Sequence, residues 1–191
     1  YVAEDAAQRI VVTYEHRDAV VGVAAAREAN HLVHDEAPGN VAAHLVQEVG
    51  DAQLRIETAP HVLELDLDIE RSACMPMEGR GILARWDVDD GRLRVHSSTQ
   101  TSTGVRAALA AKLGLPLNRV EVIAPDIGGG FGVKIMHPWP EDVCVAAAAR
   151  RLQSSVKWTE DRREHFISSA HERQQLQKVC VGFDDDGRVL G

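Results

Sequence analysis

The 191-residue chain has few cysteines and few aromatic residues, and its three cysteines are far apart. Cys74, Cys144 and Cys180 form no CxxC pair. Zinc sites and iron–sulfur clusters use closely spaced thiolates, so neither is predicted in this chain. Isolated thiols in odd number are typical of reduced cysteines, and we expect these three to be buried in a cytoplasmic protein.

Other absences narrow the class of protein further. No stretch approaches the roughly 20 apolar residues that a membrane-spanning helix needs. The net charge of −8 disfavours a nucleic-acid partner or an anionic membrane. The nine histidines show neither HxxxH nor HExxH spacing, so no histidine metal site is predicted. No signal peptide is recognisable and no methionine begins the chain, so we expect a processed product or a piece of a longer protein.

The first 60 residues are weakly patterned. We predict short elements here: a helix at 3–8, a strand at 10–14, a strand and then a helix within 19–30, and a short helix at 41–50. Residues 31–60 have the character of a linker or a domain boundary.

From residue 61 onward the pattern is much stronger. Four apolar residues alternate with four acidic ones between Leu63 and Glu70, which indicates a strand with one apolar face. Asp89-Asp90-Gly91 is typical of a hairpin turn between strands at 82–87 and 92–96. Further strands are predicted at 120–123, 156–158 and 174–183.

Two helices are predicted between these strands. One is capped by Ser102 or Thr103 and ends at Leu113, before Gly114. The other covers 141–152, with Pro140 in its first turn. This mixture predicts an α+β (mixed α/β) fold in which helices pack on a mixed sheet.

The most unusual segment is the glycine loop, Asp126-Ile127-Gly128-Gly129-Gly130-Phe131-Gly132-Val133-Lys134. Such a backbone reaches positive φ at little cost and can present N–H groups to an electron-rich ligand. A dinucleotide-binding fingerprint fails, because Val133 stands where its last glycine would be. A P-loop fails too, because Val133 separates Gly132 from Lys134 and no hydroxyl residue follows. A tight structural connection remains an alternative.

Several segments occur in an order that resembles one protein family. Glu78-Gly79-Arg80 and Ser98-Thr99-Gln100 precede the glycine loop, and Lys157-Trp158-Thr159-Glu160-Asp161-Arg162 follows it. Together they resemble the molybdenum-cofactor-binding large subunit of the xanthine oxidase, aldehyde oxidoreductase and carbon monoxide dehydrogenase family.

The resemblance implies a domain division. It covers about residues 62–191, and residues 1–30 are similar to the end of the hammerhead-like α/β domain that precedes it. The division is therefore 1–30 for that end, 31–60 for a linker, and 61–191 for the first molybdenum-cofactor-binding domain, incomplete at its C-terminus.

The resemblance also implies a molybdopterin cofactor with molybdenum, expected in its cytosine dinucleotide form. The matching cofactor-binding residues are Gln100, Gly129, Gly130, Phe131 and Gly132. Gln100 resembles a glutamine whose neutral amide donates to an oxygen ligand of the metal. The loop would offer backbone N–H groups, and Phe131 would form a wall of the pocket, although ordinary core packing is compatible with it.

Charged residues near these motifs are expected at the surface. Lys134 is interpreted as solvated. The carboxylates of Glu160, Asp161 and Glu164 are interpreted as a surface ion-pair cluster with the neighbouring arginines.

Departures from the family pattern restrict the assignment. Ile135 occupies the place of a glutamate that binds substrate in the xanthine-hydroxylating branch, so a purine bound in that way is not expected. The family's general base lies in a C-terminal part that these residues do not include, so no catalytic residue is assigned. No metal ligand is assigned either, and no cysteine matches the copper-binding position of the carbon monoxide branch.

The leading hypothesis is part of the catalytic large subunit of a molybdenum hydroxylase, inactive on its own. The enzyme would oxidise an aldehyde, an N-heterocycle or a similar small molecule with a water-derived oxygen. Electrons would pass to iron–sulfur (2Fe-2S) and flavin (FAD) partner subunits or domains, and the remainder of the large subunit would be a further partner. The alternatives are a non-catalytic scaffold or interaction module without molybdenum, and an independent nucleotide-binding domain.

Overall fold

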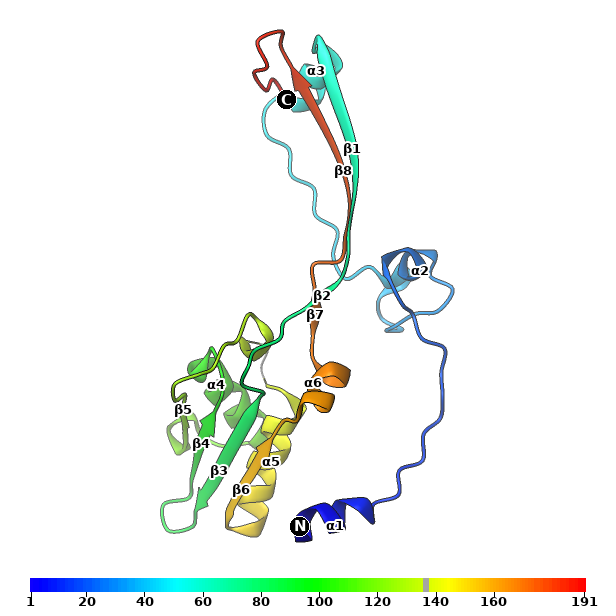
Figure 1. The fold of residues 1–191 in the computed structure, drawn as a ribbon. Helices are drawn as coiled ribbons and strands as arrows, with labels where there is room; N and C mark the ends of the chain where they lie inside the picture. The colour runs from blue at the N-terminus through cyan, green and yellow to red at the C-terminus, as the bar shows by residue number, and fades with distance from the viewer. Residues whose placement is uncertain (136–137) are drawn as a thin grey trace. The chain divides into compact units, whose positions relative to one another are not determined.

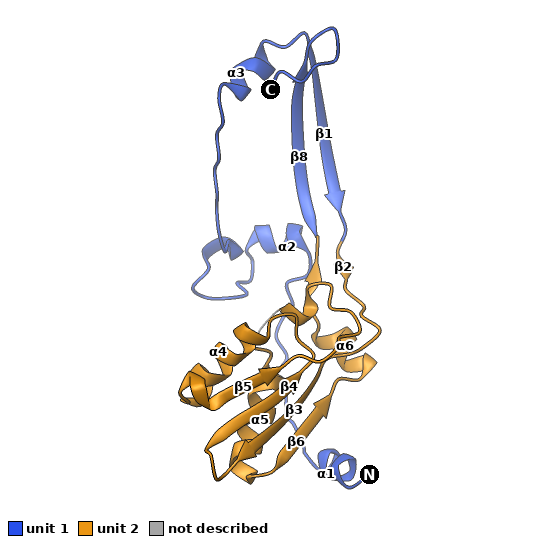
Figure 2. Ribbon diagram, turned by 90° about the vertical axis from the view of Figure 1, so that its left-hand side faces the viewer, with its two compact units in different colours: residues 1–70, 174–191 blue, residues 71–173 orange. Residues whose placement is uncertain are grey.

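The computed structural model describes residues 1–135 and 138–191, which form two compact units (Figure 2). Unit 1 comprises residues 1–70 and 174–191, and unit 2 comprises residues 71–173. The division predicted from the sequence concerns domains of a longer protein, and it stays a prediction.

Unit 2 is built on a four-stranded mixed sheet in the order β5-β4-β3-β6 (Figure 1). β3 (Gly81–Asp87) pairs antiparallel with β4 (Arg92–Ser97) and with β6 (Ser155–Thr159). β5 (Val120–Ile123) runs parallel to β4, and the crossover that a parallel pair requires contains the helix α4 (Ser102–Leu113). The mixed sheet with helices confirms the predicted fold class.

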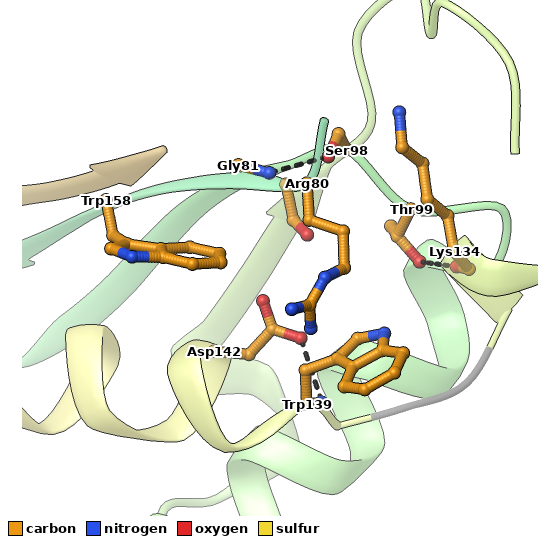
Figure 3. Close-up of a pocket in the computed structure, with 9 residues that line it drawn as sticks. Arg80, Gly81, Ser98, Thr99, Lys134, Trp139, Asp142 and Trp158 are labelled. Atoms are coloured by element: carbon orange, nitrogen blue, oxygen red, sulfur yellow. Dashed lines mark hydrogen bonds between the residues drawn. The ribbon is translucent and has the colours of Figure 1, made fainter. Parts of the chain in front are cut away.

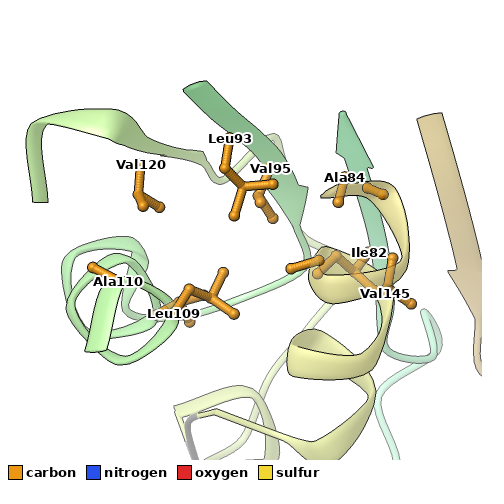
Figure 4. Close-up of a cluster of buried hydrophobic side chains, with 11 residues drawn as sticks. Ile82, Ala84, Leu93, Val95, Leu109, Ala110, Val120 and Val145 are labelled. Atoms are coloured by element: carbon orange, nitrogen blue, oxygen red, sulfur yellow. The ribbon is translucent and has the colours of Figure 1, made fainter. Parts of the chain in front are cut away.

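The core of unit 2 lies between this sheet and two helices, α4 and α5 (Pro140–Leu152) (Figure 4). Along β4, Leu93 and Val95 are buried while Arg92 and Arg94 are exposed, so the strand places alternate residues on the helix-covered face. On α5, Ala146 and Ala149 are completely buried, and their small side chains let the helix lie close to the sheet.

The predicted helix ends are largely confirmed. Pro140 is the first residue of α5, and α4 ends at Leu113 with Gly114 in the left-handed conformation at φ 61°. The N-cap of α4 is Thr101 rather than Ser102 or Thr103.

The remaining elements of unit 2 are short. β2 (Ser72–Ala73) pairs with β7 (His171–Glu172), and two 3-10 helices lie at η2 (Leu117–Arg119) and η3 (Val133–Ile135). An additional helix, α6 (Arg162–Ser168), follows β6.

The start of α6 corrects part of the predicted surface ion-pair cluster. Asp161 accepts a hydrogen bond from the backbone nitrogen of Glu164 at 2.7 Å, and Glu164 accepts one from the backbone nitrogen of Asp161 at 2.8 Å. This reciprocal capping box satisfies N–H groups that the first turn of a helix leaves free. The two carboxylates therefore cap a helix, and their interpretation as surface ion pairs is wrong.

Unit 1 contains a two-stranded antiparallel ribbon of β1 (His61–Ile69) and β8 (Gln175–Phe183). Its register runs from His61 opposite Phe183 to Ile69 opposite Gln175. The two strands confirm the predicted strands in these segments. Three short α-helices and one 3-10 helix complete it, and they are α1 (Val2–Gln8), α2 (Val23–Glu28), η1 (Pro38–Asn40) and α3 (Ala52–Glu57).

Three predictions for the first 60 residues are wrong, because no strand forms at residues 10–14 or within 19–30, and residues 41–50 form no helix. The helix predicted within 19–30 does form, as α2. Val11 and Leu45 are 90% and 86% exposed, so neither segment has a tertiary partner here. A lone strand lacks its ladder hydrogen bonds, and a short helix is marginal without packing.

The cysteines are free, as expected, but they are not buried. Cys144 is exposed, and Cys74 and Cys180 are half-buried. Within the described ranges, no helix is long and apolar enough to cross a bilayer.

Candidate functional site

The glycine loop follows β5 in unit 2, and its last two residues belong to η3. Its backbone adopts unusual conformations. Gly129 and Gly132 both have φ 91°, and Phe131 between them has φ 49°. Residues with side chains seldom adopt positive φ, whereas glycine does so at little cost. The glycines are therefore needed for the path of this backbone.

Gln100, three residues after the end of β4, lies directly against this loop. Its side-chain oxygen accepts a hydrogen bond from the backbone nitrogen of Gly132 at 3.1 Å. A Cβ atom added to Gly130 would lie 2.5 Å from the same oxygen, so a side chain there would displace Gln100 or the loop. The structure thus brings together the predicted site residues from two segments about 30 positions apart in the chain.

The bond to Gly132 also fixes the orientation of the Gln100 amide. A backbone N–H can be met only by an acceptor, so the amide oxygen faces the loop and the NH₂ group faces away from that bond. Gln100 is exposed, and its NH₂ group donates to no residue that the structure describes. It is therefore a neutral donor that is available to a ligand.

The loop backbone offers two further donors. Gly128, Gly129 and Gly132 each use their N–H group in a hydrogen bond within the chain. In contrast, the N–H groups of Gly130 and Phe131 donate to none of residues 1–135 and 138–191. Successive N–H groups in a glycine-rich turn, next to a free amide NH₂, suit an electron-rich ligand.

Phe131 is not a core residue in these units, because it is 67% exposed. Its ring packs against Gly129, where an added Cβ would lie 2.9 Å from the ring atom Cε2. Its carbonyl oxygen accepts a hydrogen bond from Cys74 Sγ at 2.8 Å. The alternative of ordinary core packing is therefore wrong for the described residues, and the role as a pocket wall stays a prediction.

Lys134, expected to be solvated, is fully buried. Its ammonium group lies 2.6 Å from Glu78 Oε2, which also accepts a hydrogen bond from the Gly128 nitrogen at 2.8 Å. The hydrogen bond from Lys134 holds the pKa of Glu78 below its ordinary value. The prediction failed because Glu78 lies 56 residues earlier, where local patterns do not reveal a pairing.

Glu160 also differs from the prediction, because its side chain is buried in a polar network. Arg80 Nη2 lies 2.7 Å and Arg80 Nε 2.8 Å from Glu160 Oε1, and His165 Nδ1 lies 3.1 Å from Oε2. Burial favours a raised pKa for Glu160, but the hydrogen bonds from Arg80 and His165 outweigh it and lower the pKa. Glu160 therefore belongs to the interior, and its interpretation as a surface residue is wrong.

Arg80 lines a small cavity together with Lys134, the last residue of the loop segment (Figure 3). Its guanidinium lies 3.9 Å from the ring centroid of Trp139 and 5.5 Å from that of Trp158. Trp139 Nε1 in turn donates to the carbonyl oxygen of Val133 at 3.2 Å. Trp139 thus connects the polar network of Arg80 to Val133, in the last part of the loop.

Sequence reasoning missed the roles of Glu78, Arg80 and His165. The segment Glu78-Gly79-Arg80 belongs to the motifs that carry the family resemblance, so its position was a signal, but no role was assigned to it. Among the described residues, no group of three or more His, Cys, Asp or Glu side chains could hold a metal ion directly.

The chain is similar to known proteins over most of its length. Residues 33–191 match the family described as molybdopterin cofactor-binding domain. The nicotine 6-hydroxylase large subunit of Paenarthrobacter nicotinovorans is 34% identical over 189 residues, which are 99% of this chain and 23% of that protein. The carbon monoxide dehydrogenase large chain of Hydrogenophaga pseudoflava is 29% identical over 205 residues, covering 100% of this chain and 25% of that one.

Solved structures show the same similarity. Quinoline 2-oxidoreductase from Pseudomonas putida 86 superposes with a TM-score of 0.83 at 34% identity, covering 98% of this chain and 24% of that chain. Reconstituted carbon monoxide dehydrogenase from Oligotropha carboxidovorans gives a TM-score of 0.84 at 28% identity, covering 99% and 25%. The chain thus spans about a quarter of the length of the proteins it matches.

Proposed function

The chain belongs to the molybdopterin cofactor-binding domain family of the xanthine oxidase group, and we propose that it forms the first part of the cofactor site in a molybdenum hydroxylase. The whole protein would oxidise an aldehyde, an N-heterocycle or a similar small molecule with oxygen from water. The two relatives at 34% identity are named for nicotine and quinoline, which favours a nitrogen heterocycle.

The observation that carries this proposal is the NH₂ group of Gln100, which donates to none of the described residues, while the oxygen of the same amide accepts from Gly132 at 3.1 Å. The N–H groups of Gly130 and Phe131, without partners among the described residues, add two donors from the same loop. The lack of space for a Cβ at Gly130 shows a backbone packed closely against Gln100. These groups fit a ligand rich in oxygen and sulfur acceptors.

The cofactor, when bound, would supply two-electron redox chemistry at molybdenum. Gln100 would donate a hydrogen bond to an oxygen of that group without adding charge to the site. Gly130 and Phe131 would donate from the backbone, with no side chain to reorganise. The exposed ring of Phe131 would exclude water from one side of the pocket.

Local electrostatics are compatible with an electron-rich ligand. Glu78 is a carboxylate in contact with the loop, and Lys134 lies 2.6 Å from it and balances its charge. Lys134 is therefore engaged within the protein, which disfavours the alternative of a phosphate site that uses this lysine. No catalytic residue is assigned within the chain.

The wider assembly is part of the same proposal. We infer that iron–sulfur and flavin centres reside on partner subunits or domains in the cytoplasm, and that the pterin carries a cytosine dinucleotide. Names such as "large subunit" and "complex subunit gamma" among the relatives support a multi-subunit enzyme. The division into residues 1–30, 31–60 and 61–191 is proposed for the domains of that large subunit.

The test is metal analysis of the complete gene product, purified with its partner subunits from cells that make the cofactor. We expect about one molybdenum per large subunit, together with iron and flavin. Absence of molybdenum from such preparations would overturn the proposal and favour a scaffold that retains the fold without the metal.

A further inference from the structure

We propose that Glu78 and Lys134 are positioning residues, whose ion pair fixes the glycine loop and so aims the amide NH₂ group of Gln100 at the cofactor. The inference rests on the proposed function. The two side chains do not contact the NH₂ group of Gln100 or the N–H groups of Gly130 and Phe131. They act on these donors through the backbone of the loop.

Glu78 holds the start of the loop. Its carboxylate accepts from the Gly128 nitrogen at 2.8 Å, and its own backbone nitrogen donates to the Gly128 oxygen at 3.3 Å. A Cβ added to Gly128 would lie 2.7 Å from the Glu78 Cβ, so the two backbones are in close contact. The first glycine is thereby fixed on both its donor and its acceptor.

Lys134 holds the other end of the loop and also holds Gln100. Its carbonyl oxygen accepts from the Gln100 nitrogen at 3.0 Å and from the Thr99 hydroxyl at 3.1 Å (Figure 3). A shift of Lys134 would therefore move the backbone of Gln100 as well as the loop. The Glu78 carboxylate contacts the side chain of this same lysine, so one carboxylate joins the start of the loop to its end.

The charges make this arrangement sensitive to substitution. The Lys134 side chain is 0% exposed, whereas that of Glu78 is 42% exposed. Loss of the carboxylate would leave a buried ammonium group without its counter-charge, which is strongly unfavourable. We expect the lysine then to move towards water, which releases the loop.

The experiment uses the complete protein with its partners and the variant Glu78→Gln. This variant keeps the shape of the side chain and an oxygen for the Gly128 N–H group, while it removes the charge and replaces the second oxygen with an NH₂ group. The matched control is Glu121→Gln, which removes the charge from an exposed pair with Arg94 at 2.7 Å. Gln100→Ala and the double variant E78Q/Q100A complete a cycle.

Two readouts are measured. Hydrogen exchange of the peptide covering 126–134 needs no bound metal, and we expect it to accelerate about tenfold in E78Q and to remain unchanged in E121Q. In the molybdenum-loaded protein, we expect the EPR signal of the half-reduced metal to shift in E78Q. On a Q100A background the same substitution should add little further shift, because the group that it positions is absent.

The outcomes distinguish failure of this inference from failure of the proposed function. Loaded E78Q with wild-type loop exchange and EPR signal would overturn the inference and leave the proposed function intact, as would fully additive effects of E78Q and Q100A. A wild-type protein without molybdenum would overturn the proposed function, on which the inference rests. If E78Q does not fold, Glu78→Asp shortens the same carboxylate by one methylene and gives a smaller change in both readouts.

Discussion

The side-chain oxygen of Gln100 lies 3.1 Å from the backbone nitrogen of Gly132, and this single bond decides which end of the amide a ligand meets. Because the N–H group of Gly132 can only donate, it must bond the amide oxygen, and the NH₂ group faces away from that bond. Gln100 and the glycine loop therefore act as one unit rather than as two independent contacts.

The first prediction concerns Gln100→Glu, which keeps an oxygen for the Gly132 N–H group but replaces the donor with a second acceptor. We expect molybdenum to be retained and the rate of metal reduction by substrate to fall by about 10²-fold, as for removal of one preorganised donor. Stopped-flow reduction of the loaded protein measures this rate. A rate within twofold of wild type would show that the NH₂ group makes no productive contact.

The second prediction concerns Gly130→Ala, whose Cβ would lie 2.5 Å from Gln100 Oε1. Because the loop or Gln100 must move, we expect the molybdenum content of the purified protein to fall by more than half. Gly81→Ala is the control, since its Cβ would meet its nearest atom at 3.8 Å. Equal molybdenum content in the two variants would contradict the close fit of Gln100 against the loop.

The third prediction concerns Glu160→Gln in the interior. This substitution removes the closer of two carboxylates that pair with the buried Arg80, and Glu141 at 3.3 Å remains. We therefore expect the free energy of unfolding to fall by about 2–3 kcal/mol, as for loss of hydrogen bonds to a charged group. Denaturant unfolding of the complete protein provides the measurement. Glu121→Gln, in an exposed pair, should cost about 1 kcal/mol or less.

The fourth prediction concerns pH and the same carboxylate. The pKa of Glu160 is lowered in the folded protein, so its contribution to stability is present above its ordinary value of 4.5 and is lost as pH falls through the lower folded value. Stability measured from pH 7 down to the acid range should decline less steeply in Glu160→Gln than in wild type. Parallel curves would show that Glu160 is not linked to the transition.

The fifth prediction concerns Trp139, which stacks on Arg80 at 3.9 Å and donates to the Val133 oxygen at 3.2 Å. Trp139→Phe keeps an aromatic face and removes the N–H donor, so we expect a loss of about 1 kcal/mol in unfolding free energy. Trp139→Leu also removes the cation–π contact and should cost more. Thermal unfolding of the two variants tests this order, which equal losses would contradict.

The sequence predicted the elements of unit 2 well because local signals determine them. Gly114 ends α4, Pro140 begins α5, and Asp90-Gly91 turns β3 into β4. Predictions for the first 60 residues failed where short segments such as 10–14 had no partner to pack against. Periodicity shows which face of a segment is apolar, but it does not show whether anything covers that face.

The candidate site was predicted in part. The loop and Gln100 carry recognisable motifs, and the structure places them in contact. The supporting charges were not recognised, because Glu78 and Lys134 are 56 residues apart and Arg80 and Glu160 are 80 apart. Local sequence does not show that a charged residue is buried, because its counter-charge comes from a distant part of the chain.

The pairing of β2 with β7 has a further consequence. Ser72 lies opposite Glu172 and Ala73 opposite His171, so the chain enters and leaves unit 2 through neighbouring strands. Units whose two ends lie close together are the ones that tolerate insertion into an exposed loop of another protein. Residues 71–173 have this geometry. The same geometry would allow this unit to be replaced as a whole while β1 and β8 keep their register.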